Sequence, residues 1–472
     1  ADLLSAMDFD ETGNYLATGD RGGRVVVFQR SNGDSETRSP AGADDKSRSK
    51  RHSRTPANAQ YRFHTEFQSH EPEFDYLKSM EIEEKINSLK WCKGTMGCKM
   101  LLTTNDKTIK LWKIYGKKIK AVTNMNLGPP ALATGGGRET SFGSSSSMSS
   151  RSSSGSNPDL SDSSGLASDS SAAPPSLRLP QMSTCEKVVT ATPKRTFANA
   201  HSYHINSLAL NSDGESFISC DDLRVNLWNL RSTSCCFNLV DAKPSSMETL
   251  SEVITSADFH PSHCQNFLYS SSRGCVRLGD MRCNALCDRQ AKVFEAPEEG
   301  EKSFFHEITS SISNARFSKC GRYIAARDYM CVRLWDVNME SRPVKTFQVH
   351  EHLRPHLGEL YKSDTIFDKF EVSFSHDSQH IVTGSYQNTF RVLSVDGSKE
   401  DEVIEAKKNI GRRHDAKVPR SNGAGGMDAD KEGSSFPAAD INFTKRSLHA
   451  AFHPHEDSIA IAATSALYIF RA

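Results

Sequence analysis

The chain repeats one pattern of strands seven times along its 472 residues. Each copy has a short apolar strand, a polar turn, a second strand ending in small residues, a tight turn, and a third strand of β-branched and aromatic residues. The third strands read RVVVF (24–28), TIKLWKI (108–114), RVNLWNL (224–230), CVRLGDM (275–281), CVRLWDV (331–337), TFRVLSV (389–395) and ALYIF (466–470). Alternating or wholly apolar runs of this length indicate half-buried or buried strands, and a repeat of about 40–50 residues indicates a propeller or a solenoid.

Two further marks recur in register with the third strands. Five copies place Leu or Ile five residues before the residue that closes the first strand, as Leu4 and Phe9, Ile86 and Trp91, Ile205 and Leu210, Ile254 and Phe259, and Ile312 and Phe317. A Phe followed by a His stands where a fourth strand would end, as Phe67 and His70, Phe197 and His201, and Phe347 and His350. We therefore expect an all-β fold, a single seven-bladed WD-repeat β-propeller over 1–472. A solenoid of open strands is the alternative, and it would leave an unprotected edge.

The spacing between copies locates three insertions, near 29–60, 115–190 and 396–440. We expect each of them to follow a third strand, which would place all three on one face. Within the second, residues 135–171 are a Ser/Gly tract with too few apolar residues to offset the entropy of ordering the backbone, so the tract is predicted to be disordered. The last copy ends on its third strand, and we expect its fourth strand to come from residues before Ala1.

Charge and hydropathy exclude several classes of partner. The chain has 58 basic and 58 acidic residues, which argues against binding to nucleic acid or to an anionic membrane surface. No apolar run approaches the roughly 20 residues of a membrane span, and the first residues lack the features of a signal peptide. We therefore expect a cytosolic protein. The segment KSRSKRHSR (46–54) raises nuclear import as an alternative to a solvated basic loop.

The sequence contains no motif typical of an enzyme or of a cofactor site. It has no Walker motif, no G-x-S-x-G elbow and no glycine fingerprint opening a helix. A metal site is conceivable at His449, His453 and His455, but FHPHEDSIA there occupies the same turn as FHPSHCQNF (259–267), which favours a strand connection. The twelve cysteines lack paired zinc-site spacing. We expect no catalysis, no cofactor and no metal.

Acidic residues concentrate on the face that carries the turns between second and third strands, which we call the top face. Asp20, Asp106, Asp221, Asp222 and Asp328 stand in these turns, and the connection from 66 to 84 holds seven acids against one lysine. Such a surface suits a basic segment of another protein. For each aspartate alone, the alternative is that it caps its own turn.

Several longer strings resemble one family closely. ATGDRGGRVVVF, FQSHEPEFDYLKSMEIEEKIN, FANAHSYHINSL, FHPSHCQNFLYSSSRG and IFDKFE are similar to the B, or 55 kDa, regulatory subunits of protein phosphatase 2A, and the likeness runs in order from Asp2 to Phe470. The resemblance implies a non-catalytic subunit. It would dock on the scaffold (A) and catalytic (C) subunits and select phosphoprotein substrates with basic segments through an acidic groove on the top face. A WD-repeat adaptor of another complex, such as a ubiquitin ligase receptor, is the alternative.

The resemblance also implies site residues. Substrate docking falls on Glu81, Glu83, Glu84, Tyr203, His204, Asp222 and Leu250, and on Arg21, where the family usually has Lys. The aspartates in the turns of the top face, which we call the rim aspartates, add Asp20 and Asp328 as further substrate-binding candidates. Scaffold binding falls on a hairpin insertion over 115–195, whose returning strand carries Leu177, Leu179 and Met182. The Ser/Gly tract departs from the family at the tip of this hairpin.

Overall fold

The computed structural model describes residues 3–31, 60–76, 78–93, 98–123, 180–288, 292–297, 304–397, 401–406 and 442–471. Residues 3–115 and 189–471 belong to one compact unit, and Gly116–Val188 belong to a second. Six four-stranded sheets and one three-stranded sheet follow one another along the chain. Between β4 and β7 lies a separate two-stranded hairpin, β5 (Glu73–Asp75) and β6 (Met80–Ile82).

Each sheet, or blade, is built from consecutive strands. The first three blades consist of β1 (Leu4–Phe9), β2 (Tyr15–Asp20), β3 (Arg24–Ser31) and β4 (Gln60–Gln68); β7 (Ser88–Cys92), β8 (Lys99–Thr104), β9 (Ile109–Thr123) and β10 (Gln181–Phe197); and β11 (Ser207–Leu210), β12 (Ser216–Cys220), β13 (Arg224–Asn229) and β14 (Ser232–Asp241). The fourth and fifth consist of β15 (Ile254–Phe259), β16 (Asn266–Ser271), β17 (Cys275–Asp280) and β18 (Lys292–Glu295); and β19 (Asn314–Phe317), β20 (Tyr323–Arg327), β21 (Cys331–Asp336) and β22 (Lys345–Gln348). The last two consist of β23 (Val372–Phe374), β24 (His380–Gly384), β25 (Thr389–Ser394) and β26 (Glu402–Glu405); and β27 (Ser447–Phe452), β28 (Ser458–Ala463) and β29 (Ala466–Arg471).

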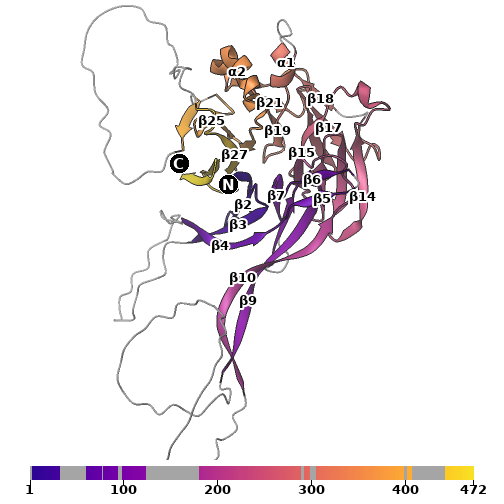
Figure 1. Cartoon of the computed structure of the whole chain (residues 1–472). Helices are drawn as coiled ribbons and strands as arrows, with labels where there is room; N and C mark the ends of the chain where they lie inside the picture. Colours follow the sequence, from indigo (N-terminus) through magenta and orange to yellow (C-terminus); the bar gives the residue numbers. More distant parts are fainter. Residues whose placement is uncertain are drawn as a thin grey trace, which may run out of the picture. The chain divides into compact units, whose positions relative to one another are not determined.

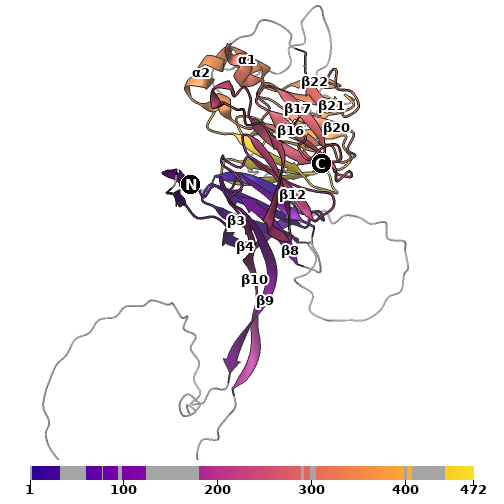
Figure 2. The same ribbon diagram turned by 90° about the vertical axis from the view of Figure 1, so that its right-hand side faces the viewer.

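The blades form a closed ring (Figures 1 and 2). The first strand of every blade contacts the first strand of the next, and β27 of the last blade contacts β1 of the first. The backbone N–H of Leu4 donates to the carbonyl of Thr464 at this junction, over 3.1 Å. This arrangement confirms the seven-bladed β-propeller predicted from the repeat.

The hydrophobic core is divided among the gaps between neighbouring blades. Between the third and fourth blades, for example, Val240 and Ile218 pack with Phe259 and Phe267, all of them buried. Corresponding clusters lie between all the remaining pairs of adjacent blades, including the last and the first. The strands alternate in the sequence because each blade buries residues against both of its neighbours.

The third blade carries a buried polar network that locks its turn. The carboxylate of Asp221 accepts a hydrogen bond from Nδ1 of His201 over 2.9 Å, and Nε2 of His201 is 2.6 Å from Oγ of Ser219. The same hydroxyl accepts from Nε1 of Trp228 over 2.9 Å. Burial acts to raise the pKa of Asp221, but the hydrogen bonds from His201 and from the backbone N–H groups of Leu223 and Arg224 outweigh it, and the pKa is lowered.

Two of the expected insertions follow a third strand, and one expectation was wrong. The gap after β3 and the excursion between β9 and β10 both connect a third strand to a fourth. In the third range, 396–440, the strand β26 pairs with β25 as a fourth strand, so the greater part of that range follows a fourth strand instead. A four-residue outer strand with a single half-buried side chain gives no strand pattern that the sequence could reveal. The last sheet has three strands within the described residues.

Short helices occupy connections between blades on the top face. The helix α1 (Phe304–Thr309) precedes β19, and η2 (Glu351–His356), α2 (Leu357–Lys362) and η3 (Thr365–Phe367) precede β23. The helices α1 and α2 lie together (Figure 2), and the rings of Phe304 and Tyr361 meet edge to face. None of the helices in the described ranges is long and apolar enough to span a bilayer.

Candidate protein-docking face

Three of the rim aspartates are structural. Asp20, Asp221 and Asp328 are each at most 5% exposed. Their carboxylates accept hydrogen bonds from backbone N–H groups of their own turns, those of Arg24, of Leu223 and Arg224, and of Met330 and Cys331. Both Asp20 and Asp328 therefore use their carboxylates within the turn, and their role in substrate binding stays a prediction. Capping, the alternative raised from the sequence, accounts for them.

The acidic segment from Glu71 to Glu84 forms the β5–β6 hairpin with its flanks, and we call it the acidic hairpin. In β5 and β6, Glu73 pairs with Ile82, Phe74 with Glu81, and Asp75 with Met80. The side chains of Glu81 and Glu83 are exposed, whereas Glu84 is half-buried. Phe74, Tyr76 and Met80 are also exposed, and Tyr76 is 86% exposed. The hairpin thus offers apolar contact area as well as negative charge, and only the charge had been predicted.

The acidic hairpin is fixed to the ring at both ends. Before it, the carbonyl of Gly23 accepts from the N–H groups of Ser69 and His70, over 2.9 and 3.2 Å. Gly23 has a φ of 74°, and a Cβ there would lie 2.2 Å from the carbonyl oxygen of His70, so only glycine fits this turn. Near its end, the carbonyl of Glu83 accepts from the side-chain amide of Asn105 over 3.1 Å.

Lysine side chains join the acidic hairpin to the neighbouring connection. Nζ of Lys78 and Nζ of Lys107 both donate to the carbonyl of Ser202, over 2.9 and 2.7 Å. Ser202 precedes the predicted residues Tyr203, which is half-buried, and His204, which is exposed. The structure therefore brings Tyr203 and His204 next to the acidic hairpin, as the sequence interpretation requires.

The remaining predicted residues lie on the same face. Nδ1 of His204 is 3.1 Å from a carboxylate oxygen of Asp106, and Asp222 accepts from the side-chain amide of Asn206 over 2.9 Å. Leu250 is half-buried and follows the short helix η1 (Met247–Thr249) in the connection between the third and fourth blades. That connection ends where the N–H of Ile254 donates to the carbonyl of Asp222, over 2.7 Å.

A cavity of about 620 Å³ opens at the centre of the top face. Of the predicted residues it is lined by Arg21, His204 and Asp222 but not by Glu81, Glu83 or Glu84. Its charged lining comprises five cations and four acids, Arg21, Lys85, Arg316, Lys369 and Arg446 with Asp106, Asp222, Asp368 and Glu371. The centre of the top face is therefore mixed in charge, and the exposed acids Glu81 and Glu83 lie outside the cavity lining. The sequence did not predict Lys85 and Lys369 as cavity residues, because a single lysine forms no recurring sequence pattern.

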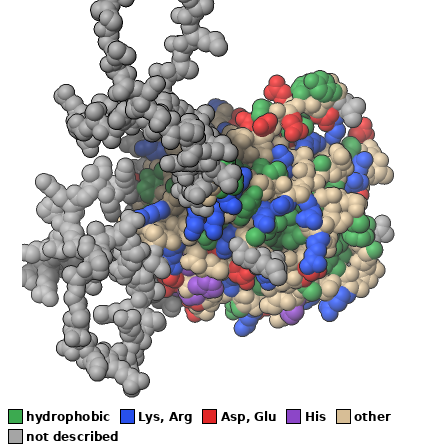
Figure 3. Space-filling view, turned by 90° about the horizontal axis from the view of Figure 1, so that it is seen from below, with side chains coloured by type: hydrophobic (Ala, Val, Ile, Leu, Met, Phe, Trp, Pro, Cys, Tyr) green, Lys and Arg blue, Asp and Glu red, His purple; other side chains and the backbone are tan. Residues whose placement is uncertain are grey.

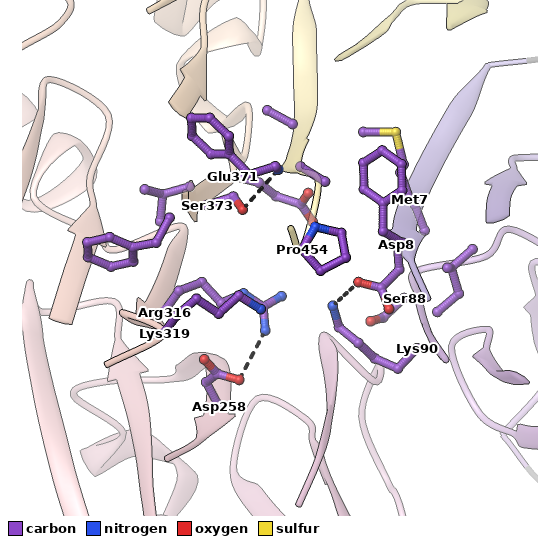
Figure 4. Close-up of a pocket in the computed structure, with 18 of the residues that line it drawn as sticks. Met7, Asp8, Ser88, Lys90, Asp258, Arg316, Lys319, Glu371, Ser373 and Pro454 are labelled. Atoms are coloured by element: carbon purple, nitrogen blue, oxygen red, sulfur yellow. Dashed lines mark hydrogen bonds and ion pairs between the residues drawn. The ribbon is translucent and has the colours of Figure 1, made fainter. Parts of the chain in front are cut away.

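A second cavity, of about 240 Å³, lies further along the same inner strands (Figure 4). Ion pairs between blades cross it, with Nζ of Lys90 2.8 Å from Asp8 and a guanidinium nitrogen of Arg316 3.4 Å from Asp258. Each pair joins the first strands of neighbouring blades, so the lining is a structural network between blades.

Of the three histidines of the metal candidate, His453 stabilises a turn, and His449 lies in β27 and is paired with Glu371. Nδ1 of His453 accepts from the N–H groups of His455 and Glu456, and its Nε2 donates to the carbonyl of Gly13 over 3.1 Å. His260 makes the same set of bonds in the fourth blade, with Ser262, His263 and Gly321. This match confirms the strand-connection interpretation. The described residues contain no cluster of His, Cys, Asp and Glu arranged to hold a metal ion.

Charge on the face drawn in Figure 3 is mixed, and one of the three proposed scaffold residues lies within the described part of the chain. Lys and Arg side chains are spread over the face drawn in Figure 3, with Asp and Glu between them where grey atoms do not cover it. Met182, on β10, is 70% exposed, whereas Leu177 and Leu179 lie outside the described residues. The Ser/Gly tract 135–171 also lies outside them.

Comparison with known proteins gives consistent results. The model of the family "WD domain, G-beta repeat" matches residues 191–229, the segment that contains the complete His201–Asp221–Ser219–Trp228 network. Over its whole length the chain is 49% identical to the beta isoform of the 55 kDa regulatory subunit of serine/threonine protein phosphatase 2A from Arabidopsis thaliana, covering 93% of that protein. It is 45% identical to the phosphatase 2A regulatory subunit phr2AB of Dictyostelium discoideum and to a PP2A regulatory subunit of Schizosaccharomyces pombe, covering 94% and 93% of them.

A solved structure supports the fold alone. The β-propeller domain of Cps50 (Swd1) from Myceliophteria thermophila superposes with a TM-score of 0.50 over 100% of this chain and 98% of that one, at 11% identity. This result agrees with the blade arrangement described above.

Proposed function

Because this chain belongs to the family of 55 kDa regulatory B subunits of serine/threonine protein phosphatase 2A, we propose that it docks phosphoprotein substrates for an assembled phosphatase. The relatives are named as regulatory subunits, in line with the expectation that the chain is not an enzyme. In this role it binds a scaffold subunit and a catalytic subunit, and it selects substrates that carry basic segments. The chemistry belongs to the catalytic subunit.

One observation carries this proposal, the acidic hairpin held on the top face. Its exposed carboxylates Glu81 and Glu83 stand with the exposed side chains of Phe74 and Tyr76, whose rings meet edge to face. Negative charge attracts a basic segment over several ångströms, and apolar side chains then supply contact area that a charged surface alone lacks. A segment held there needs no contact with a catalytic centre in this chain.

Met182 and the rest of the hairpin insertion 115–195 are the proposed scaffold contacts. The apolar side chain of Met182 is exposed and therefore available for contact with another subunit. The Ser/Gly tract at 135–171 offers few apolar side chains, so the tip contributes little binding energy. The site of action proposed for this complex is the cytosol.

Binding to purified phosphatase scaffold tests the proposal against the alternative, a WD-repeat adaptor of another complex. We expect the full chain to retain the scaffold in a pull-down, and a chain lacking 135–171 to do so with affinity within about threefold, because a disordered tract adds little fixed contact. Absence of scaffold binding by the full chain would favour the adaptor. A loss of more than about tenfold, or 1.4 kcal/mol, on deletion alone would place the tip in the interface.

A further inference from the structure

Three cationic side chains converge on the central cavity of the top face without a partner among the described residues. Arg21 comes from the turn of the first blade, Lys85 from the end of the acidic hairpin, and Lys369 from the connection that follows η3. Within the described part of the chain, these three side chains make no hydrogen bond or ion pair, although all line the same cavity of about 620 Å³. They reach it from different blades of the ring.

Arg21 and Lys369 both act on the charge of Lys85. Burial lowers the pKa of Lys85, and the charges of Arg21 and Lys369 lower it further, only partly offset by Asp106 and Glu83. Lys85 is half-buried, whereas Arg21 and Lys369 are exposed, so the cost of holding the charges near one another falls on Lys85 and is relieved when an anion enters between them.

The acids of the cavity do not serve as counter-ions at hydrogen-bonding distance, because each already has its own partner. Asp368 is paired with Arg446, Glu371 with His449, Asp106 with Asn87 and His204, and Asp222 with Asn206. The acids of the cavity therefore have partners within the described residues whereas these three cations have none, a charge distribution that suits an incoming anion.

We propose that this cavity binds an anionic side chain, a carboxylate or a phosphate, of the same polypeptide whose basic residues lie on the acidic hairpin. The inference rests on the proposed docking function and refines it, because it gives the docked segment two charges of opposite sign. Lys85 follows Glu83 and Glu84 directly in the chain, so the negative and positive subsites adjoin. A segment that binds both the negative and the positive subsite can lie in only one direction across the top face.

The test uses a display library of random 20-residue peptides, selected on the protein assembled with its scaffold and catalytic subunits. Three forms are compared, the unchanged protein, the double variant Lys85→Gln and Lys369→Gln, and the control Lys292→Gln. Lys292 is an exposed lysine on β18, remote from the cavity lining. Peptides retained by the unchanged protein and by the control should be enriched in Lys or Arg together with Asp or Glu at a fixed offset. On the double variant the acidic preference should vanish and the basic preference persist.

Synthetic peptides from the selection then identify the anion. Replacing the preferred Glu by Gln should weaken binding to the unchanged protein about tenfold, and to the double variant less than twofold. A phosphoserine at that position should bind at least as well as Glu if the cavity accepts phosphate, and like Gln if it accepts only a carboxylate.

The outcomes separate this inference from the function on which it rests. Enrichment of basic peptides without acidic ones on the unchanged protein would overturn the anion site and leave basic-segment docking intact. The proposed anion site is also wrong if the double variant keeps the preference for acidic residues. It is equally wrong if the double variant loses both the acidic and the basic preference. Absence of basic enrichment on every form would overturn the docking proposal itself.

Discussion

His70 is a buried neutral histidine at the entrance to the acidic hairpin. It is 1% exposed, and its Nε2 donates to the carbonyl of Thr108 over 3.1 Å while its Nδ1 lies 3.1 Å from Oγ of Ser69. Burial, the largest cause, and the charge of Lys110 together lower its pKa to about 3, although the bond to Thr108 acts in the opposite direction. The folded protein therefore disfavours protonation of this ring, whereas in the unfolded chain the ring becomes protonated near pH 6.5.

This difference predicts how stability depends on pH. A folded pKa below the unfolded one gives stability that is complete above about pH 6.5 and is lost as the pH falls from there toward 3. Replacing His70 by Gln should lower the free energy of unfolding at pH 8 but also flatten its decline between pH 6.5 and 5, by up to about 1.4 kcal/mol per pH unit. Urea unfolding at several pH values measures this. An unchanged slope in the variant would contradict the assignment.

Single residues show where sequence reasoning succeeds and where it stops. Asp20 and Asp328 were correctly placed in turns on one face, but an exposed carboxylate and a capping carboxylate occupy the same sequence position, and only burial distinguishes them. Lys369 lies within the quoted string IFDKFE, yet nothing local marks it as facing a cavity. Its environment is made by segments far away in the chain, which no local pattern records.

Among the elements, the third blade should owe much of its stability to one hydroxyl. Oγ of Ser219 joins His201 to Trp228, and all three residues are buried. The substitution Ser219→Ala leaves a ring nitrogen and an indole N–H without this partner, at about 1–3 kcal/mol for each unsatisfied group. We expect a loss of about 2 kcal/mol or more in the free energy of unfolding, measured by denaturant titration.

Two control substitutions make the role of the hydroxyl specific. Ser219→Thr keeps the hydroxyl and should recover part of the loss, and Ser234→Ala, at an exposed position on β14, should change stability by less than about 0.5 kcal/mol. Equal losses in Ser219→Ala and Ser219→Thr would indicate that steric fit at this position matters more than the hydrogen bonds.

The elements also differ in how well their sequence predicts them. All seven predicted third strands are present. Six of them lie inside their sheets and contain buried side chains, whereas β29, the edge strand of the last sheet, has none. Fourth strands such as β26 and β18 are outer strands with mostly exposed side chains, and burial therefore imposes no pattern on them. The acidic hairpin was placed correctly between two blades, but its pairing as β5 and β6 depends on three residues in each strand and could not be read from the sequence.

For the whole molecule, the proposed function predicts a charge effect that depends on the type of substrate. Glu81 and Glu83 are the exposed acids of the hairpin's second half, whereas Glu84 is half-buried and its reversal would disturb the fold as well as the charge. We expect Glu81→Lys combined with Glu83→Lys to slow dephosphorylation of a protein substrate with basic flanks. Each exposed pair contributes about 0–1 kcal/mol, so the loss of two pairs should reduce kcat/KM by up to about thirtyfold.

Salt and a small substrate distinguish docking from damage to the enzyme. The effect should be larger at about 50 mM than at about 300 mM salt, since at low salt the repulsion created by the reversal is least screened. Hydrolysis of a small phosphate ester by the assembled phosphatase should not change, because that substrate does not reach the propeller.

The pair Glu295→Lys and Glu340→Lys makes the same change in net charge at exposed positions on and near the fourth and fifth blades, away from the hairpin. That control should leave both activities intact, since attraction falls off with distance in salt. If it slows the protein substrate as much as the hairpin reversal does, the steering comes from the net charge of the ring and not from the acidic hairpin.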